Sequence, residues 1–199
     1  MSKADDLMQH LEAGKVYRRA DLEQWSNAVD RHVSQLVKQG FLEKLSPGLY
    51  HVPKKTVFGS VPPSDEALVH SFLKGDDFLL TSPNAYNGLG VGTTQLYNRR
   101  VVYNHKRHGE FMLGGKSFYF HAKHRFPTTL TKEFLLVDLL NNLDKIAEDR
   151  EVVLTQALTQ AGHMDSGKLR QAATRYGSIK TKKLLRPLLH VPQACAYAH

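Results

Sequence analysis

The 199-residue sequence has a single cysteine, Cys195, and contains no run of eighteen consecutive apolar residues. One cysteine excludes an intramolecular disulfide framework and fits a reducing cytoplasm. The absence of a long apolar run argues against a transmembrane helix. The first fifteen residues carry acids and no apolar h-region, so they do not resemble a signal peptide. We therefore expect a soluble, cytoplasmic protein.

Patterns typical of catalytic and metal sites are also lacking. The acids Asp65 and Glu66 are adjacent, and adjacent side chains on a helix diverge by about 100°, so they cannot easily share a metal ion. The histidine pairs at 105 and 108 and at 121 and 124 would point to opposite faces of a strand. No Ser-His-Asp spacing is recognisable. We expect a protein that is not an enzyme and that needs neither a metal nor a cofactor.

Acidic residues are outnumbered, with 19 Asp and Glu against 27 Lys and Arg, which gives a formal net charge of +8 and a pI near 9.5. This balance suggests a polyanionic partner. Residues 99–125 contain seven bases and one acid, and residues 168–186 contain seven bases and no acid. These stretches supply a candidate second basic surface: Arg99, Arg100, Lys106, Arg107, Lys168, Arg170, Lys180, Lys182 and Lys183. It is either a solvated face or a contact for DNA, for an RNA such as tRNA, or for an acidic protein patch.

Three short apolar stripes with helical spacing occupy residues 7–11, 22–25 and 29–37, and the third ends at Gly40. Helices of about ten residues are not stable alone, so these stripes must pack on one another. Ser46-Pro47-Gly48 separates two short alternating runs, which predicts a β-hairpin. Helices followed directly by a hairpin are the order of a winged helix-turn-helix domain, and we expect one in residues 1–57.

The third predicted helix has a polar face opposite its apolar stripe. Asn27, Arg31, Ser34 and Gln35 lie there and are candidates for reading DNA bases, because these side chains match the donors and acceptors of base edges. Asp30 is a misfit near phosphate, although the first turn of a helix favours an acid. The ordinary alternative is a solvated face, which any amphipathic helix presents. Candidate phosphate contacts are Arg18, Arg19, Lys38, Lys44, Lys54 and Lys55.

Residues 58–199 are predicted to form a second domain. After a link at residues 53–63, Ser64 is expected to cap a helix, and residues 78–80 to form a strand. A hairpin is predicted across Gly114-Gly115, and the pattern is helical from Thr131 onward, with Pro187 ending or kinking the last helix. The predicted fold class is α+β, with an N-terminal winged helix-turn-helix domain followed by a mixed α/β and then helical C-terminal domain.

The succession of motifs resembles AbiEi-type antitoxins of bacterial type IV toxin-antitoxin systems. The stretch DLEQWSNAVDRHVSQLVKQGFLEKLSPGLY resembles their winged helix. The segments FGSVPPSDEALVHSFL, SPNAYNGLGVGTTQ, GGKSFYFHAKHRFP, DLLNNLDKIAEDR and LRQAATRYGSIKTKKLL follow in the family's order. The family's recognition helix maps onto residues 27–38 and its wing onto residues 43–52. This sequence departs from the family at Arg18, where relatives often have a capping Ser or Thr, and at Trp25, where a smaller residue is common.

The resemblance implies an antitoxin that represses its own operon by binding double-stranded operator DNA through the winged helix. It also implies that the protein opposes a toxin with a nucleotidyltransferase fold through its C-terminal domain. Two copies meeting on the operator are compatible with this interpretation, and no membrane partner is expected. The alternative is a DNA- or RNA-binding regulator without a toxin.

Overall fold

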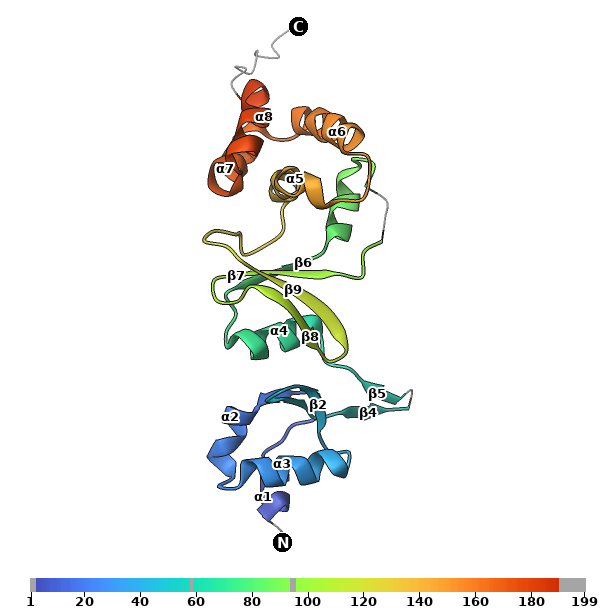
Figure 1. The fold of residues 1–199 in the computed structure, drawn as a ribbon, viewed down its shortest axis with the longest axis vertical. Helices are drawn as coiled ribbons and strands as arrows, with labels where there is room; N and C mark the ends of the chain where they lie inside the picture. The colour runs from blue at the N-terminus through green and yellow to red at the C-terminus, as the bar shows by residue number, and fades with distance from the viewer. Residues whose placement is uncertain (1–2, 58, 94–95, 190–199) are drawn as a thin grey trace, which may run out of the picture. The chain divides into compact units, whose positions relative to one another are not determined.

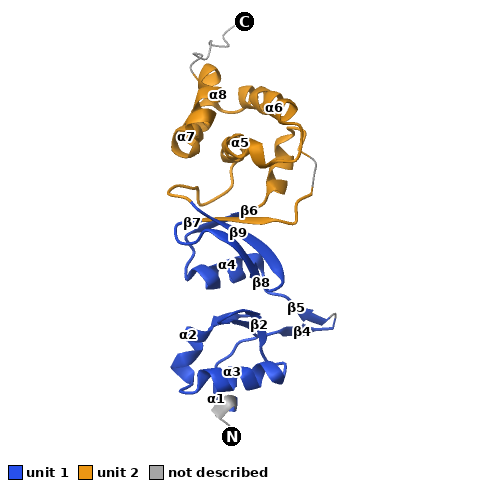
Figure 2. Ribbon diagram, in the orientation of Figure 1, with its two compact units in different colours: residues 1–80, 104–122 blue, residues 81–103, 123–199 orange. Residues whose placement is uncertain are grey.

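The computed structural model describes residues 3–57, 59–93 and 96–189, and its architecture is mixed α+β, as the sequence predicted (Figure 1). The chain divides into two compact units (Figure 2). Unit 1 comprises Met1–Leu80 and Asn104–Ala122, and unit 2 comprises Thr81–Tyr103 and Lys123–His199. Unit 1 is therefore larger than the segment predicted as a winged helix. Cys195 lies outside the described residues.

The first part of unit 1 contains three helical segments and a small sheet. Its elements are α1 (Lys3–Gln9), β1 (Val16–Arg18), α2 (Arg19–Leu22), the 3-10 turn η1 (Glu23–Trp25), α3 (Val29–Lys38), β2 (Glu43–Ser46) and β3 (Leu49–His51). The sheet has the strand order β1-β3-β2 and is antiparallel throughout. The pairing of β2 with β3 confirms the predicted hairpin, in which Gly48 adopts a φ of 75° at the turn. β1 was not predicted.

A shared hydrophobic core holds these short helices together. α3 buries Val29, Val33 and Leu36, whose side chains are 5%, 3% and 1% exposed. Leu7 of α1 and Leu22 of α2 are completely buried in the same cluster. Full burial of such a side chain stabilises the fold by about 1.5–3 kcal/mol. The apolar stripes predicted from the sequence therefore face one another, and each helix depends on the others.

The link predicted at residues 53–63 contains two short strands that the sequence did not predict. β4 (Lys54–Thr56) and β5 (Gly59–Val61) pair antiparallel there, with Lys54 opposite Val61 and Lys55 opposite Ser60. All six residues of the two strands are exposed, so the sequence has no apolar alternation that would have indicated a strand. Figure 1 shows this hairpin projecting from the rest of unit 1.

The remainder of unit 1 is α4 (Asp65–Leu73) and the hairpin of β8 (Gly109–Leu113) and β9 (Lys116–Ala122). The hydroxyl of Ser64 accepts a hydrogen bond from the Ala67 backbone N–H at 3.1 Å, which confirms the predicted cap. The predicted hairpin across Gly114-Gly115 is also confirmed, with Leu113 opposite Lys116. The rings of Phe72, Phe111 and Phe120 join the helix to the hairpin, at centroid distances of 5.0 to 5.5 Å. β6 (Phe78–Thr81) matches the predicted strand.

Unit 2 is mainly helical. Its elements are the 3-10 segment η2 (Pro83–Leu89), β7 (Arg100–Asn104, whose last residue belongs to unit 1), α5 (Lys132–Asn141), η3 (Leu143–Lys145), α6 (Arg150–His163), α7 (Ser166–Tyr176) and α8 (Ile179–Leu189). Side chains of Thr131, Asp149 and Asp165 cap three of the helices. Pro187 does not end α8, which continues to Leu189. Leu185 and Leu189 are buried on either side of the proline, so core packing offsets the lost backbone hydrogen bond.

A polar cluster lies inside the helical core of unit 2. Asp138 of α5 is 1% exposed and accepts hydrogen bonds from the hydroxyls of Tyr86 at 2.8 Å and Tyr103 at 2.7 Å. The Lys123 ammonium also donates to Asp138, at 3.0 Å, and lies 3.6 Å from the centre of the Tyr103 ring. Burial, followed by the charge of Asp138, raises the pKa of both tyrosines well above the ordinary range, so both hydroxyls remain donors.

Candidate nucleic-acid interface

The outer face of α3 is a ridge of polar side chains. Arg31, Ser34, Gln35 and Lys38 recur every three or four residues and are all exposed. Asn27 is also exposed and precedes the helix by two residues. Within the described part of the chain, none of these five side chains makes a hydrogen bond or an ion pair. Their donors and acceptors therefore remain available to a ligand along the whole helix.

The start of α3 is fixed by a contact that the sequence did not predict. The hydroxyl of Ser26 lies 2.7 Å from Nδ1 of His32 and accepts a hydrogen bond from the Ala28 backbone N–H at 3.3 Å. His32 is 4% exposed and belongs to the buried face of the helix. A histidine inside an apolar stripe was the available signal, because a buried imidazole needs a polar partner. This contact sets which residues of α3 face outward.

Arg19 and Asp30 form an ion pair that changes the predicted charge of this surface. The guanidinium of Arg19 donates to both carboxylate oxygens of Asp30, at 2.6 and 2.7 Å, and also to Glu23. The hydrogen bonds from Arg19, and then its positive charge, hold the pKa of Asp30 below its usual range. Asp30, the acid that did not fit the predicted DNA-reading face, thus has an ion-pair partner within the protein. Arg19, a candidate phosphate contact, shares its charge with two carboxylates.

Arg18 also forms an ion pair with a carboxylate, that of Asp21. Its Nη2 and Nε donate to the carboxylate of Asp21 at 2.7 and 3.1 Å, and its backbone N–H donates to the same carboxylate at 2.9 Å. The carboxylate of Asp21 thereby satisfies the backbone N–H of Arg18, the residue that precedes α2. Both arginines of the predicted phosphate set are consequently engaged by acids.

The lysines of the predicted phosphate set have no such partners. Lys38 lies at the end of α3, Lys44 lies on β2, and Lys54 and Lys55 lie on β4. All four are exposed, and none of their ammonium groups makes an ion pair or a hydrogen bond within residues 3–57, 59–93 and 96–189. Lys44, Lys54 and Lys55 therefore add three available cations to the Lys38 of the α3 ridge.

The residues of the candidate second basic surface are divided between the two units. Lys106 and Arg107 belong to unit 1, where Lys106 donates to the Leu73 carbonyl at 3.0 Å and Arg107 lies over the Phe72 ring. The other seven belong to unit 2. Arg170 donates to the Leu189 carbonyl, and Lys180 lies 3.6 Å from Asp144.

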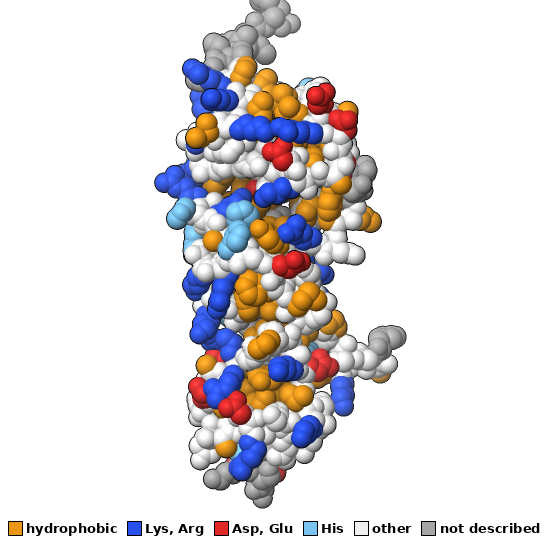
Figure 3. All heavy atoms as spheres, viewed as in Figure 1, with side chains coloured by type: hydrophobic (Ala, Val, Ile, Leu, Met, Phe, Trp, Pro, Cys, Tyr) orange, Lys and Arg blue, Asp and Glu red, His pale blue; other side chains and the backbone are white. Residues whose placement is uncertain are grey.

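Three lysines of the unit 2 set, Lys168, Lys182 and Lys183, are exposed on α7 and α8. Figure 3 shows basic side chains over these two helices on the face that it draws. The residues of the candidate second basic surface therefore belong to both units, and several of them already have a structural role.

No family model matches this chain. A search of curated proteins also finds no match. Among solved structures, the chain is similar to the crystal structure of the RV2827C protein from Mycobacterium tuberculosis, with a TM-score of 0.56 and 15% sequence identity. The match covers 94% of this chain and 74% of that chain. At this identity the similarity shows a shared fold and nothing about activity.

Two further searches concern other kinds of site. None of the helices in the described ranges has both the length and the apolar character needed to cross a membrane. In the same ranges, no group of three or more His, Cys, Asp or Glu side chains is placed to hold a metal ion.

Proposed function

We propose that this chain is an operator-binding transcriptional repressor whose α3 enters the major groove of DNA. The observation that carries the proposal is the α3 ridge, a row of exposed side chains with unused donors and acceptors on a helix whose opposite face is buried. The order of α1, β1, α2, α3, β2 and β3 supports the proposal, because a winged helix-turn-helix domain also places a hairpin directly after its recognition helix. A solvated amphipathic helix also has an exposed polar face, and the side-chain types on the α3 ridge together with the hairpin that follows favour DNA reading.

Each side chain of the ridge has a base that it matches. Arg31 can donate to O6 and N7 of guanine, and Asn27 and Gln35 can bond adenine through two hydrogen bonds. Ser34 can either donate or accept. The helical rise from Arg31 to Lys38 is about 10 Å, which corresponds to roughly three base pairs. The ridge therefore has the length of a short recognition site.

Lysines would supply the contacts to the DNA backbone. Lys38 lies at the end of the ridge, and Lys44 lies on the hairpin that follows α3, where a wing meets phosphates. Lys54 and Lys55 extend this set onto the projecting β4–β5 hairpin. Arg18 and Arg19 would contribute only if phosphate replaced their carboxylate partners.

We further propose that the protein is an antitoxin acting against a nucleotidyltransferase-like toxin. This part rests on the resemblance of the sequence to AbiEi-type antitoxins, and it assigns toxin opposition to the C-terminal part of the chain. Binding of two copies to one operator belongs to the same proposal. A regulator without a toxin is the alternative.

Footprinting and gel-shift titration on the DNA upstream of the coding sequence test the repressor part. We expect Arg31→Ala to cost about 1–3 kcal/mol in binding free energy and to relax base preference, because it removes a base contact. Lys38→Ala should weaken binding to all sequences similarly. Arg150→Ala, a matched change of an exposed arginine in unit 2, is the control and should bind as the wild type does. If all three variants protect the DNA equally, α3 is not the reading helix.

Co-expression with the neighbouring gene tests the antitoxin part. We expect the neighbouring gene alone to arrest growth, and we expect this chain to restore it. Harmless expression of that gene would favour the regulator without a toxin and would leave the DNA-binding part of the proposal intact.

A further inference from the structure

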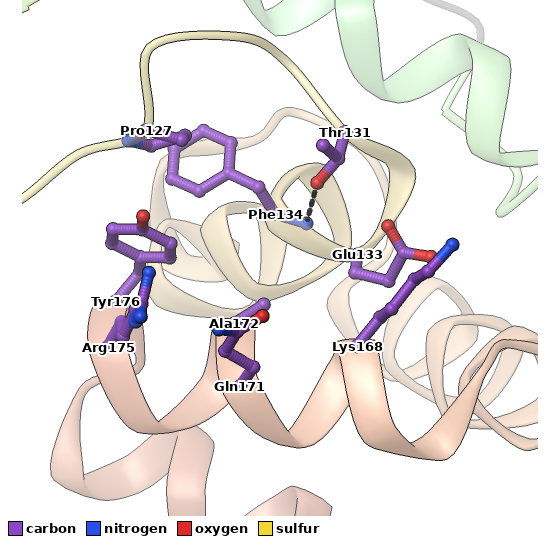
Figure 4. A pocket seen from close by; sticks show the side chains of 9 residues that line it. All are labelled: Pro127, Thr131, Glu133, Phe134, Lys168, Gln171, Ala172, Arg175 and Tyr176. Carbon is purple, nitrogen blue, oxygen red and sulfur yellow. Dashed lines mark hydrogen bonds between the residues drawn. The ribbon is translucent and has the colours of Figure 1, made fainter.

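A hollow of about 270 Å³ lies within unit 2, between the first turn of α5 and one face of α7 (Figure 4). Its size is close to the lower end of the range for small-molecule sites, about 300 to 1,000 Å³. α7 contributes Lys168, Gln171 and Arg175, which share one face because they are three, four and seven residues apart. α5 contributes Glu133 and Phe134.

The polar side chains around this hollow are not used within the protein. In the described part of the chain, the side chains of Lys168, Gln171, Arg175 and Glu133 make no hydrogen bond or ion pair. This contrasts with neighbouring polar groups, since Arg170 donates to the Leu189 carbonyl and Asn141 donates to the Tyr176 carbonyl. Lys168, Gln171 and Arg175 are exposed, so their polar groups are open to solvent and to a ligand that enters the hollow.

The hollow also has an apolar wall at one end. The rings of Phe134 and Tyr176 meet edge to face with centroids 5.3 Å apart, and Pro127 lies beside them. Figure 4 shows Arg175 next to Tyr176, whereas Glu133 and Lys168 face each other at the other end. A second hollow shares Gln171 and Arg175 with the first. The arginine end is therefore the more positive one, because the carboxylate of Glu133 offsets Lys168.

This arrangement selects the chemistry of the ligand. A phosphate would lie at Arg175, because a guanidinium binds phosphate through paired hydrogen bonds. The carboxylate of Glu133 can accept a hydrogen bond, as acidic side chains do from the exocyclic amino group of cytosine. The apolar wall lies beside Arg175, so the part of the ligand next to the phosphate must tolerate the rings of Phe134 and Tyr176. Inorganic phosphate would make no favourable contact with the Glu133 carboxylate. A purely apolar ligand would leave the charged side chains without partners.

We propose that the hollow between α5 and α7 binds a nucleoside monophosphate unit, with the phosphate at Arg175 and an amino-bearing base at Glu133. The same chemistry is offered by a free nucleotide and by an unpaired nucleotide of a single strand. This site is separate from the α3 ridge and does not depend on duplex binding by unit 1.

Isothermal titration of the full chain with CMP, UMP, cytidine and inorganic phosphate tests the proposal. We expect CMP to bind saturably and more tightly than UMP, whose base lacks the amino group. Arg175→Gln should weaken CMP binding by about tenfold to a hundredfold, the effect of losing a hydrogen bond to a charged group. Glu133→Gln should reduce the preference for CMP over UMP. Arg186→Gln, an exposed arginine of α8 outside the hollow, is the control and should bind CMP as the wild type does.

The outcomes distinguish a free nucleotide from a nucleotide within a single strand, and they include results that contradict the proposal. A 5′-phosphorylated cytidine octanucleotide that binds more tightly than CMP, and that Arg175→Gln weakens, would identify a strand as the ligand. Equal binding of the octanucleotide and CMP would identify the free nucleotide. The proposal is overturned if no nucleotide binds saturably, if inorganic phosphate binds as tightly as CMP, or if Arg186→Gln weakens binding as much as Arg175→Gln. Circular dichroism melting of each variant checks that all of them fold.

Discussion

Replacing Asp30 by Asn tests the ion pair that lies beside the α3 ridge. The carboxylate of Asp30 holds the guanidinium of Arg19 through two hydrogen bonds, and Glu23 bonds the same guanidinium. Asparagine keeps the size of the side chain and removes its charge. Arg19 is then less strongly held and can neutralise a phosphate, and a negative charge is lost from the DNA-facing side. We therefore expect Asp30→Asn to bind DNA of any sequence more tightly than the wild type.

The size of the effect follows from the number of available cations. Four lysines of unit 1 are free to meet phosphates, and each neutralised phosphate contributes about −0.9 to the slope of log K against log salt concentration. The wild type should therefore show a slope of roughly −3.6 and Asp30→Asn a slope of roughly −4.5. Between 50 and 200 mM salt, one added contact corresponds to about a 3.5-fold greater loss of affinity.

Fluorescence anisotropy with a labelled duplex at several salt concentrations measures both slopes. The matched control is Glu151→Gln, which removes an exposed acid from the first turn of α6 in unit 2 and changes the net charge equally. If the two variants shift affinity and slope by the same amount, only net charge acts, and the reasoning from the Arg19 pair is refuted.

The contribution of the Arg19–Asp30 ion pair to the stability of the fold depends on pH, and it can be measured without DNA. The pKa of Asp30 is lowered in the folded protein, so the pair stabilises the fold above the ordinary carboxyl pKa. This contribution is lost as the pH falls through the lowered value. An NMR titration of the Asp30 carboxyl should show this low pKa, and Arg19→Gln should return it toward the ordinary range. An unchanged titration in Arg19→Gln would contradict the pair.

Three further predictions concern stability, each measured by urea unfolding. Asp138→Ala should lower the free energy of unfolding by about 3–5 kcal/mol, because it leaves two buried hydroxyls and an ammonium without their acceptor; a loss below 1 kcal/mol would show that the carboxylate is not buried as described. Ser64→Ala should cost about 1 kcal/mol through loss of the α4 cap, and Ser64→Thr should preserve it. Gly177→Ala should cost about 1–3 kcal/mol, because an added Cβ would lie 2.5 Å from the Ala173 carbonyl oxygen, whereas Gly162→Ala, where nothing lies within 4 Å, should be tolerated.

Elements with a repeating apolar pattern could be predicted from the sequence. The stripe of residues 29–37 predicted α3, and the runs on both sides of Gly114-Gly115 predicted the β8–β9 hairpin. β1 was missed because it has three residues and pairs with a strand more than thirty residues later. β4 and β5 were missed because they bury nothing. Short strands of this kind are defined by backbone pairing, which leaves no trace in the side-chain pattern.

The candidate site was also predicted only in part, because the sequence pattern shows which residues of a helix face outward but not which distant residues meet. Which residues of α3 face outward follows from helical geometry, and all five ridge residues are exposed. The ion pair of Arg19 with Asp30 joins residues eleven positions apart, and the hydrogen bond from Tyr86 to Asp138 joins residues 52 positions apart. Such contacts depend on the packing of separate elements, so the spacing of residues along the chain does not reveal them.

The path of the chain through the two compact units limits how this protein can be cut or recombined. The backbone leaves unit 1 after Leu80, returns at Asn104 and leaves again after Ala122, so three peptide bonds connect the units. A fragment that stops at residue 80 would lack the β8–β9 hairpin and the aromatic rings that it packs against α4. A single gene fusion point therefore cannot transfer either unit whole. Chimeras are expected to fold only when residues 81–103 and 123–199 are exchanged together, so that unit 2 is transferred whole.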